Sequence, residues 1–313
     1  MSLIARHPRY MMGIAAGMLC TLLLHAFRAY PPQGLNFMTR PHVMSIRHKL
    51  ERQEDAYAQT VQDRHAFIQK MGPTPDKVVP YPDLDASQKA YTLWDFFPPS
   101  FDCPYETTRL GTMGDGGKWI CGLSRLVKKP KCVVYSAGIS TDSSFEAAIL
   151  QKTQCEVFGF DYSVDKFGPE IENFPSLRAR TRFYKYAIAG KDEYQSNPPR
   201  WTLRTLMERH GHTFIDILKV DIEGAEFDVL AETIKYYVDN KLPLPFGQLQ
   251  LEIHSGNVPF GKFLKWWEDL EAAGLRPFHT ETNLIVVSWW RSKPTFSEYS
   301  FLNIGASHDV VED

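Results

Sequence analysis

The sequence predicts an α/β fold: a doubly wound, mostly parallel, Rossmann-like sheet with an antiparallel C-terminal edge. Short apolar runs rich in β-branched and aromatic residues alternate with stretches that have helical spacing. Two of these runs end in an acidic residue, Asp161 and Asp221. Strands of an open α/β sheet hold ligands at this end, so both acids are expected at the ligand-binding edge.

Size and composition limit the class of protein. The chain has 313 residues, enough for one large α/β domain with an appendage. Hydrophobic residues make up 43% and aromatic residues 13%, which is sufficient for a sizeable core. The net charge of -2, with 23% charged residues, indicates neither a basic surface for nucleic acid nor an acidic tail. These values indicate a globular protein without a nucleic-acid partner.

An apolar segment near the N-terminus predicts a membrane anchor. Residues 11–27 are mostly apolar, and Arg6, Arg9 and Arg28 flank them. The length lies at the lower limit of a membrane span, and the basic flank favours a cytoplasmic N-terminus. We expect a single-pass protein of the endoplasmic reticulum or Golgi with its bulk in the lumen. A cleaved signal peptide or an organelle transit peptide remains an alternative, which would make the protein secreted or mitochondrial.

Three regions are expected along the chain. Residues 1–30 form the signal anchor, and residues 31–82 form a stem that ends in a proline-rich linker. Within this stem, residues 42–71 are charged and polar with few apolar positions, which predicts a solvated helix or stem. The folded domain then spans residues 83–313.

Four of the five cysteines lie outside the apolar segment. An even number permits two disulfides in an oxidising lumen. Cys132 and Cys155 stand at the starts of two predicted strands and are therefore a plausible pair. No Cys-x-x-Cys occurs and no histidine lies at zinc-ligand spacing, so a zinc site is not expected.

The predicted elements of the domain follow in order. A glycine-rich segment, residues 111–121, is expected to be either a hairpin turn or a loop whose backbone approaches a ligand. A strand at 131–140 runs into small residues. Residues 143–150 have the Ser-x-x-Glu capping pattern and a helical face. A strand at 156–161 then ends in Asp161.

The second half of the domain repeats this alternation. Residues 182–189 predict a strand and residues 201–210 a helix. Residues 214–220 predict a buried strand, which is followed by the acidic turn 221–226 and a helix. The remaining predicted elements are a strand at 248–254, an amphipathic helix at 263–273, and late strands at 275–280, 284–290 and 298–304.

The acids of these turns have more than one interpretation. Acids in the first turn of a helix, such as Glu223 and Glu226, can simply favour its N-terminus through the helix dipole. Asp221 lies at the very end of the strand, where a ligand-binding residue is expected. Strand, glycine turn, helix, strand and terminal acid form the nucleotide-binding half of a doubly wound sheet. There, a carboxylate at Asp161 would accept hydrogen bonds from two ribose hydroxyls.

The order of these motifs resembles that of class I S-adenosylmethionine-dependent methyltransferases. The block LKVDIEGAE at residues 218–226, with LEIH at 251–254, resembles the FkbM-type methyltransferase family. The segments VVYSAGIS, SFE, VFGFD and DGGKWIC are similar to the eukaryotic, often membrane-anchored methyltransferase-like branch of that superfamily. The similarity covers the region from Phe101 to Gly305.

The resemblance implies a binding site for S-adenosyl-L-methionine. The backbone that contacts the methionine part of the cofactor would be that of Ser136, Ala137, Gly138 and Ile139. The resemblance further implies that Asp161 holds the ribose and that Ala187 or Ile188 lines the adenine pocket. It also implies that Asp221 borders the site of methyl transfer.

We hypothesise methyl transfer to a hydroxyl group, a displacement that needs positioning and the removal of one proton. His254 is the preferred general base, because an imidazole titrates near neutral pH and this residue follows a strand end. Asp221 or Glu252 would orient it or bind the acceptor. The alternative use of the cluster is a divalent metal held by these three residues and Glu223. We assign no metal.

Two alternative functions remain open. The glycine loop keeps only Gly138, and Ser136 stands where the family often has an acid, so one alternative is a non-catalytic scaffold that kept the fold. A nicotinamide-dependent enzyme is the other, although the G-x-G-x-x-G motif is missing. The expected acceptor is a small molecule or a glycan. The candidates for a sugar-binding cleft are Trp119, Trp201, Trp266, Trp267, Trp289 and Trp290, although most of them are expected in the core.

Overall fold

The computed structural model describes residues 44–83, 90–256 and 258–313. The predicted signal anchor lies outside these residues. Among the residues that are described, no helix has the length and apolar character needed to span a membrane. Ser45–Asp313 form one compact unit.

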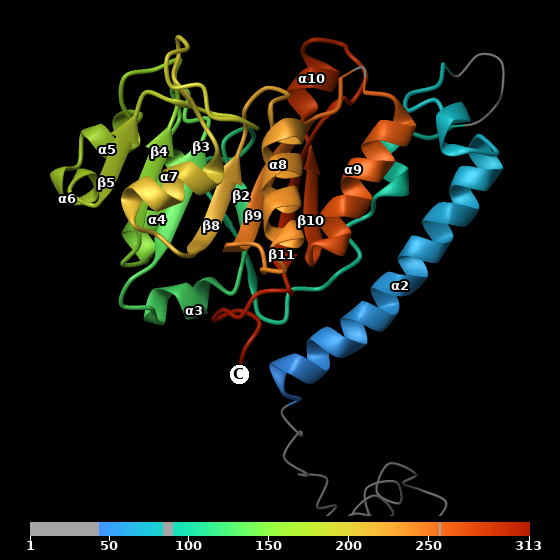
Figure 1. The fold of residues 1–313 in the computed structure, drawn as a ribbon, viewed down its shortest axis with the longest axis horizontal. Helices are drawn as coiled ribbons and strands as arrows, with labels where there is room; N and C mark the ends of the chain where they lie inside the picture. Colours follow the sequence, from blue (N-terminus) through green and yellow to red (C-terminus); the bar gives the residue numbers. More distant parts are fainter. Residues whose placement is uncertain (1–43, 84–89, 257) are drawn as a thin grey trace, which may run out of the picture. The chain divides into compact units, whose positions relative to one another are not determined.

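A seven-stranded sheet forms the centre of this unit, in the order β10-β11-β9-β8-β3-β4-β5 (Figure 1). The strands from β9 to β5 are parallel, and β11 runs antiparallel to both β9 and β10. The predicted mostly parallel, doubly wound sheet with an antiparallel C-terminal edge is therefore confirmed. Its strands are β3 (Val133–Ala137), β4 (Glu156–Phe160), β5 (Thr181–Tyr184), β8 (Ile215–Val220), β9 (Phe246–His254), β10 (Leu275–Thr282) and β11 (Phe296–Asn303).

The chain reverses its direction of travel across the sheet between β3 and β8. From β3 it moves outward to β4 and β5, and it then returns to place β8 on the other side of β3. Ala137 at the end of β3 pairs with Phe160 of β4 and with Val220 of β8. The residues that follow these strands, including Asp161 and Asp221, therefore emerge at the same edge. Open α/β sheets form their ligand crevice at such a switch point.

Helices cover both faces of the sheet. Tyr135 and Leu218 of the sheet share an apolar cluster with α7, α8 and α9, whereas Val134 and Ile217 pack with α3 to α6. Successive side chains of a strand point to opposite faces, so a strand covered on both sides is mostly apolar. The helices are α3 (Leu123–Lys128), α4 (Ser144–Lys152), α5 (Pro169–Glu172), α6 (Pro175–Arg178), α7 (Leu203–His210), α8 (Glu226–Asp239), α9 (Phe260–Ala272) and the short 3-10 helices η2 (Pro75–Lys77) and η3 (Leu93–Phe96).

Two short sheets lie outside the central one. β1 (Thr107–Leu110) and β2 (Lys118–Cys121) form an antiparallel hairpin, so the glycine-rich segment is a hairpin connection, one of its two expected roles. The predicted strand at 182–189 is split into two. Its first part is β5 of the central sheet, and its second part, β6 (Ala187–Ile188), pairs in parallel with β7 (Arg200–Trp201).

The predicted late strand at 284–290 is wrong. This segment begins with a short helix, α10 (Leu284–Ser288), and the side chain of Asn283 caps it by accepting a hydrogen bond from the Ile285 N–H at 3.1 Å. The β-branched residues at 285–287 favour a strand in the sequence. In the structure, however, Leu284 and Ile285 are exposed and pair with no strand of the described residues. The asparagine cap decides the local structure because it satisfies a helix N-terminal donor.

The four cysteines of the described residues form two disulfides. Cys132 and Cys155, with Cα atoms 4.4 Å apart, join the segments that lead into β3 and β4, so the predicted pair is confirmed. Cys103 and Cys121, with Cα atoms 5.6 Å apart, join the coil before β1 to the end of β2. The second disulfide therefore ties the hairpin to the residues that precede it.

The segment expected to be a solvated helix or stem forms a long helix, α2 (Ile46–Met71). This helix is docked on the domain rather than solvated. The Arg64 guanidinium is buried and donates to both carboxylate oxygens of Glu271 in α9, at 2.8 and 2.6 Å. The Tyr57 hydroxyl donates to the same carboxylate at 2.5 Å. From Ser45 onward the expected stem is thus part of the compact unit.

We expect Arg64→Ala to lower the free energy of unfolding by about 3–5 kcal/mol, because it leaves the Glu271 carboxylate buried without its cation. Urea unfolding followed by tryptophan fluorescence measures this loss. The control is Arg47→Ala, since Arg47 lies on the exposed side of α2 and should change stability by less than about 0.5 kcal/mol. Equal effects of the two variants would contradict the docking role.

The same pair sets a dependence on pH. Burial opposes ionisation of Glu271, but the hydrogen bonds and charge of Arg64 outweigh it and lower the pKa of this carboxyl below its ordinary value of 4.5. A lowered carboxyl pKa stabilises the fold above the unfolded value, and this stabilisation is lost as the pH falls through the folded value. The difference between wild type and Arg64→Ala should therefore shrink below about pH 4.5.

Candidate functional site

A cavity of about 890 Å³ lies at the carboxyl ends of the parallel strands. Its volume falls within the range of about 300–1,000 Å³ that small-molecule sites occupy. Most of the predicted site residues line it, namely Gly138, Ile139, Asp161, Ala187, Ile188, Asp221 and Glu252. The other three, Ser136, Ala137 and His254, are buried behind its wall.

The turn after β3 requires glycine. Gly138 has φ +80°, in the left-handed region, and a Cβ at this position would overlap the carbonyl oxygen of Asp221. The Gly138 N–H donates to the Phe160 carbonyl at 3.0 Å, and the Asp221 N–H donates to the Ala137 carbonyl at 3.1 Å. The backbones that leave β3, β4 and β8 are therefore packed directly against one another at the floor of the cavity.

Asp161 holds the loop that follows this turn. Its Oδ2 accepts hydrogen bonds from the N–H groups of Ile139 and Ser140, both at 2.8 Å. Its Oδ1 accepts from the backbone and hydroxyl of Ser163, at 2.6 and 2.7 Å. Burial opposes ionisation, but these hydrogen bonds outweigh it and lower the pKa of Asp161. Asp161 thus shapes the cavity wall, and its contact with a ribose stays a prediction.

Two charged residues behind this loop escaped the sequence analysis. Glu146 of α4 is buried and accepts a hydrogen bond from the Ser136 hydroxyl at 2.5 Å. The Lys219 ammonium donates to the Gly138 carbonyl and lies 3.7 Å from Glu146. The sequence indicates Glu146 as part of a helix cap and of the SFE segment, but Ser143 makes no side-chain cap hydrogen bond in the structure. The signal that could have revealed Lys219 is a lysine inside an otherwise apolar strand.

Ala187 and Ile188 form part of the cavity wall, although they lie far from the acidic turn in the sequence. They belong to β6, which lies outside the central sheet and pairs with β7. Both residues line the cavity, together with Pro198 and Arg200. This position agrees with an apolar wall for a planar ring, although the role as an adenine pocket stays a prediction.

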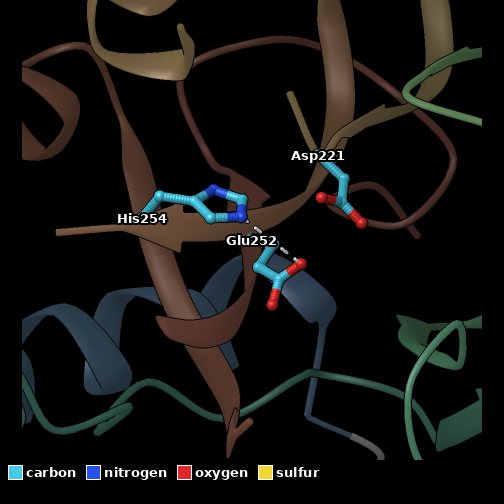
Figure 2. A group of neighbouring side chains, drawn as sticks. All are labelled: Asp221, Glu252 and His254. Carbon is cyan, nitrogen blue, oxygen red and sulfur yellow. Dashed lines mark ion pairs between the residues drawn. The ribbon is translucent and has the colours of Figure 1, made fainter. Parts of the chain in front are cut away.

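Asp221, Glu252 and His254 form one cluster beside the cavity (Figure 2). Asp221 follows β8, and the other two lie on the neighbouring strand β9, two residues apart and so on the same face. One side-chain oxygen or nitrogen from each of the three lies within 4.8 Å of the others. The structure therefore brings together the three residues predicted to serve the acceptor.

His254 has its own carboxylate partner. Glu226, at the start of α8, is fully buried and accepts from the His254 backbone N–H at 2.7 Å, and the same oxygen lies 3.3 Å from Nδ1. Nε2 faces Glu223 at 3.4 Å and Glu252 at 3.8 Å. Burial disfavours the imidazolium, but the hydrogen bond and charge of Glu226 outweigh it and raise the pKa of His254 to about 9.

Glu252 is the member of the cluster that is both buried and open to the cavity. Burial and the nearby charges of Asp221 and Glu298 raise its pKa to about 8. Asn283 donates to its Oε1 at 2.9 Å. Lys118 of β2 lies 3.7 Å from Asp221 and pairs with Glu298, so the hairpin supplies a cation to this group of acids.

The tryptophans occupy buried, half-buried and exposed positions, with Trp94 and Trp119 half-buried. Trp201, Trp266 and Trp267 are buried, as expected for most of them. Trp289 and Trp290 are 83% and 62% exposed and follow α10 directly, the helix whose cap residue Asn283 contacts Glu252. Two exposed aromatic rings therefore lie on the segment that begins at the acidic cluster.

Comparison with known proteins identifies the family to which the chain belongs. The family Methyltransf_22, described as a methyltransferase domain, matches residues 53–290. Two proteins named "Probable methyltransferase-like protein 24", from Rattus norvegicus and Homo sapiens, are each 26% identical over 201 and 195 residues. Each match covers 57% of the chain but 51% and 50% of the relative, so the chain spans about half the length of these curated relatives.

Solved structures give only a weak likeness. The METTL16 methyltransferase domain shares 10% sequence identity with a TM-score of 0.35, over 58% of this chain and 64% of that one. A TM-score of this size carries no argument about function.

We expect Gly138→Ala to lower the free energy of unfolding by about 3 kcal/mol or more, because backbone overlap adds to the strain of a positive φ. Gly211→Ala is the matched control. Gly211 has φ +70° but no atom within 4 Å of an added Cβ, so its cost should stay near 1–2 kcal/mol. Urea unfolding compares the two variants, and equal losses would show that the contact with Asp221 is unimportant.

Proposed function

The chain belongs to the family of methyltransferase domains, and on that premise we propose that it transfers a methyl group from S-adenosyl-L-methionine to a hydroxyl group. The acceptor is a small molecule or a glycan. One observation carries the proposal: a single cavity contacts both the glycine turn expected to hold the cofactor and the carboxylates expected to serve the acceptor. The motifs LKVDIEGAE and LEIH, which resemble those of the FkbM-type family, support this proposal.

The residues present fit the cofactor. The turn at Gly138 has no room for a Cβ, and Asp161 directs the loop at Ile139 and Ser140 along the cavity. These residues would hold the methionine and ribose parts, with Ala187 and Ile188 beside the adenine. When bound, S-adenosyl-L-methionine supplies a methyl group on a sulfonium, from which an oxygen nucleophile can displace it.

Glu146 compensates for the missing acid of the cofactor loop. Ser136 stands where related loops often carry a carboxylate, and this departure left a non-catalytic scaffold as an alternative. In the structure the Ser136 hydroxyl donates to Glu146, and Glu146 itself lines the cavity. A carboxylate from α4 therefore reaches the place that the loop leaves vacant. This favours a working cofactor site over a scaffold.

We assign proton removal to Glu252 rather than to His254. Glu252 and Asp221 line the cavity, whereas His254 lies behind them. During transfer the acceptor oxygen bonds to the methyl carbon and the carbon–sulfur bond breaks with its electron pair on sulfur. The hydroxyl proton passes to a Glu252 oxygen in the ionised form of this carboxyl, which its pKa of about 8 makes the dominant form only above that pH. His254 and Asn283 are positioning residues that keep this carboxylate aimed at the cavity.

Exposed aromatic rings favour a glycan acceptor. Trp289 and Trp290 are exposed on the segment that starts at Asn283, which contacts the proposed proton acceptor. Sugar rings stack their apolar faces on such side chains, while their hydroxyl groups remain free to react.

We also propose that residues 11–27 anchor the protein with its domain in a lumen. The two disulfides support an oxidising compartment. Release of the protein from membranes by alkaline carbonate would contradict the anchor and favour a cleaved signal or transit peptide.

Calorimetric titration with S-adenosylhomocysteine tests the cofactor half of the proposal on the full-length protein. Asp161→Ala should weaken binding by about 10- to 100-fold, because hydrogen bonds from the loop N–H groups to a carboxylate are worth about 1.5–3 kcal/mol. The control is Asp165→Ala, since this exposed acid pairs only with Lys185 on the surface. Absence of binding to folded wild type would favour the scaffold alternative.

Transfer of a labelled methyl group tests the acceptor half. With sugars and catechols beside matched amines as acceptors, label should appear on the hydroxyl compounds. Glu252→Gln should lower kcat by about 100-fold or more, as expected for loss of a general base, while binding of S-adenosylhomocysteine is retained. Label on the amines, or full turnover by Glu252→Gln, would overturn O-methylation with this base.

A further inference from the structure

We infer that Asp221, Glu252 and His254 bind a divalent metal cation at the wall of the cavity, and that this cation holds the acceptor oxygen. The inference deepens the proposed function and rests on it. From the sequence, a general base is the favoured use of these residues and a metal the alternative. The contacts made by their side chains reverse that preference.

The first support is the donor set. Two carboxylate oxygens and one imidazole nitrogen converge within 4.8 Å of one another, from the ends of adjacent parallel strands (Figure 2). Strand ends are rigid, so the three donors hold a defined arrangement. Oxygen donors with a single imidazole suit manganese, magnesium or zinc, and three protein ligands leave positions open for an acceptor and water.

The second support is the orientation of the histidine. Metal-binding histidines usually direct one ring nitrogen at a carboxylate, which fixes the ring and leaves the other nitrogen for the metal. Glu226 serves Nδ1 of His254 at 3.3 Å and also accepts from its backbone N–H. Nε2 is thereby aimed at Glu252 and the exposed Glu223. Glu226 is not one of the three proposed ligands, so its contact with His254 is an observation independent of the cluster.

The third support is the balance of charge. Asp221, Glu252 and Glu298 lie close together, and Lys118 is the cation that contacts two of them. Lys219 is a second cation that acts on Asp221 and Glu298, but it also pairs with Glu146, so two lysines face four carboxyl groups. Buried carboxylates in excess of their cations are costly unless a metal or protons neutralise them.

A bound cation would fit the proposed chemistry. It would hold the acceptor hydroxyl and favour its ionised form, as divalent metals do for bound oxygen ligands. A carboxylate that binds through one oxygen keeps its second oxygen, so Glu252 can still receive the hydroxyl proton. The new carbon–oxygen bond forms and the carbon–sulfur bond breaks as before, with no further reactant.

A second set of acids must be distinguished from this site. Asp115, Glu252 and Glu298 also bring donor oxygens within 4.8 Å of one another. The two sets share Glu252, so a variant of that residue cannot separate them. His254 belongs to the proposed site alone, and Glu298 belongs to the other set alone.

Titration of the full-length protein with Mn²⁺, followed by the electron paramagnetic resonance signal of the free ion, tests the site. We expect one saturable site, from which Mg²⁺ or Zn²⁺ displaces Mn²⁺. His254→Ala and Asp221→Asn should abolish saturable binding, whereas Glu298→Gln should retain it. Glu226→Gln should weaken binding by about 10- to 100-fold, because it loosens the orientation of His254. Asp239→Asn, on the exposed end of α8, is the matched control and should bind normally.

Titration of the same variants with S-adenosylhomocysteine separates the two proposals. His254 does not line the cavity, so His254→Ala should bind this ligand like wild type. Loss of Mn²⁺ binding with retained cofactor binding would support the metal site and show that the variant is folded. Wild type that binds S-adenosylhomocysteine but none of the three metals would overturn the metal site alone. Mn²⁺ binding that survives in His254→Ala would overturn it as well.

Discussion

The close packing of the Gly138 backbone against Asp221 is the contact on which the site depends. It exists because β3 and β8 are adjacent and end at the same level, although they are far apart in the sequence. The absence of a Cβ allows the two chain segments to touch. Asp161 then fixes the loop beyond the glycine through two backbone N–H groups. A cavity bordered by rigid backbone follows from these contacts.

Around that cavity the protein uses charged residues that are buried and paired. Ser136 and Glu146 share a hydrogen bond, Lys219 binds the carbonyl of Gly138, and Lys118 lies among the acids of the other wall. Such groups are expensive to bury, so they are kept where their position has a function. Acids outnumber the cations around the whole cavity, and on the acceptor side three donors from strand ends converge within 4.8 Å. This convergence is the basis for placing a cation there.

Both the structure and the family match include the helix α2 in the domain. The matched family region begins at residue 53, inside this helix. The ion pair between Arg64 and Glu271 links it to α9, which packs on the same face of the sheet as α8. The helix α8, which follows the acidic turn, and the helix α9, on which α2 docks, therefore pack in the same apolar layer. A membrane anchor before Ser45 would reach the domain through this helix.

The sequence by itself determined the alternation of strands and helices, the acids at strand ends and the pair Cys132–Cys155. These features follow from local patterns, because a strand covered on both faces is mostly apolar and turn residues mark its end. It did not reveal Lys118 beside Glu298 or Glu146 beside Ser136. Nor did it predict that Glu252 would face the cavity and His254 lie behind it. Those facts depend on contacts between segments up to 180 residues apart, which only the tertiary structure decides.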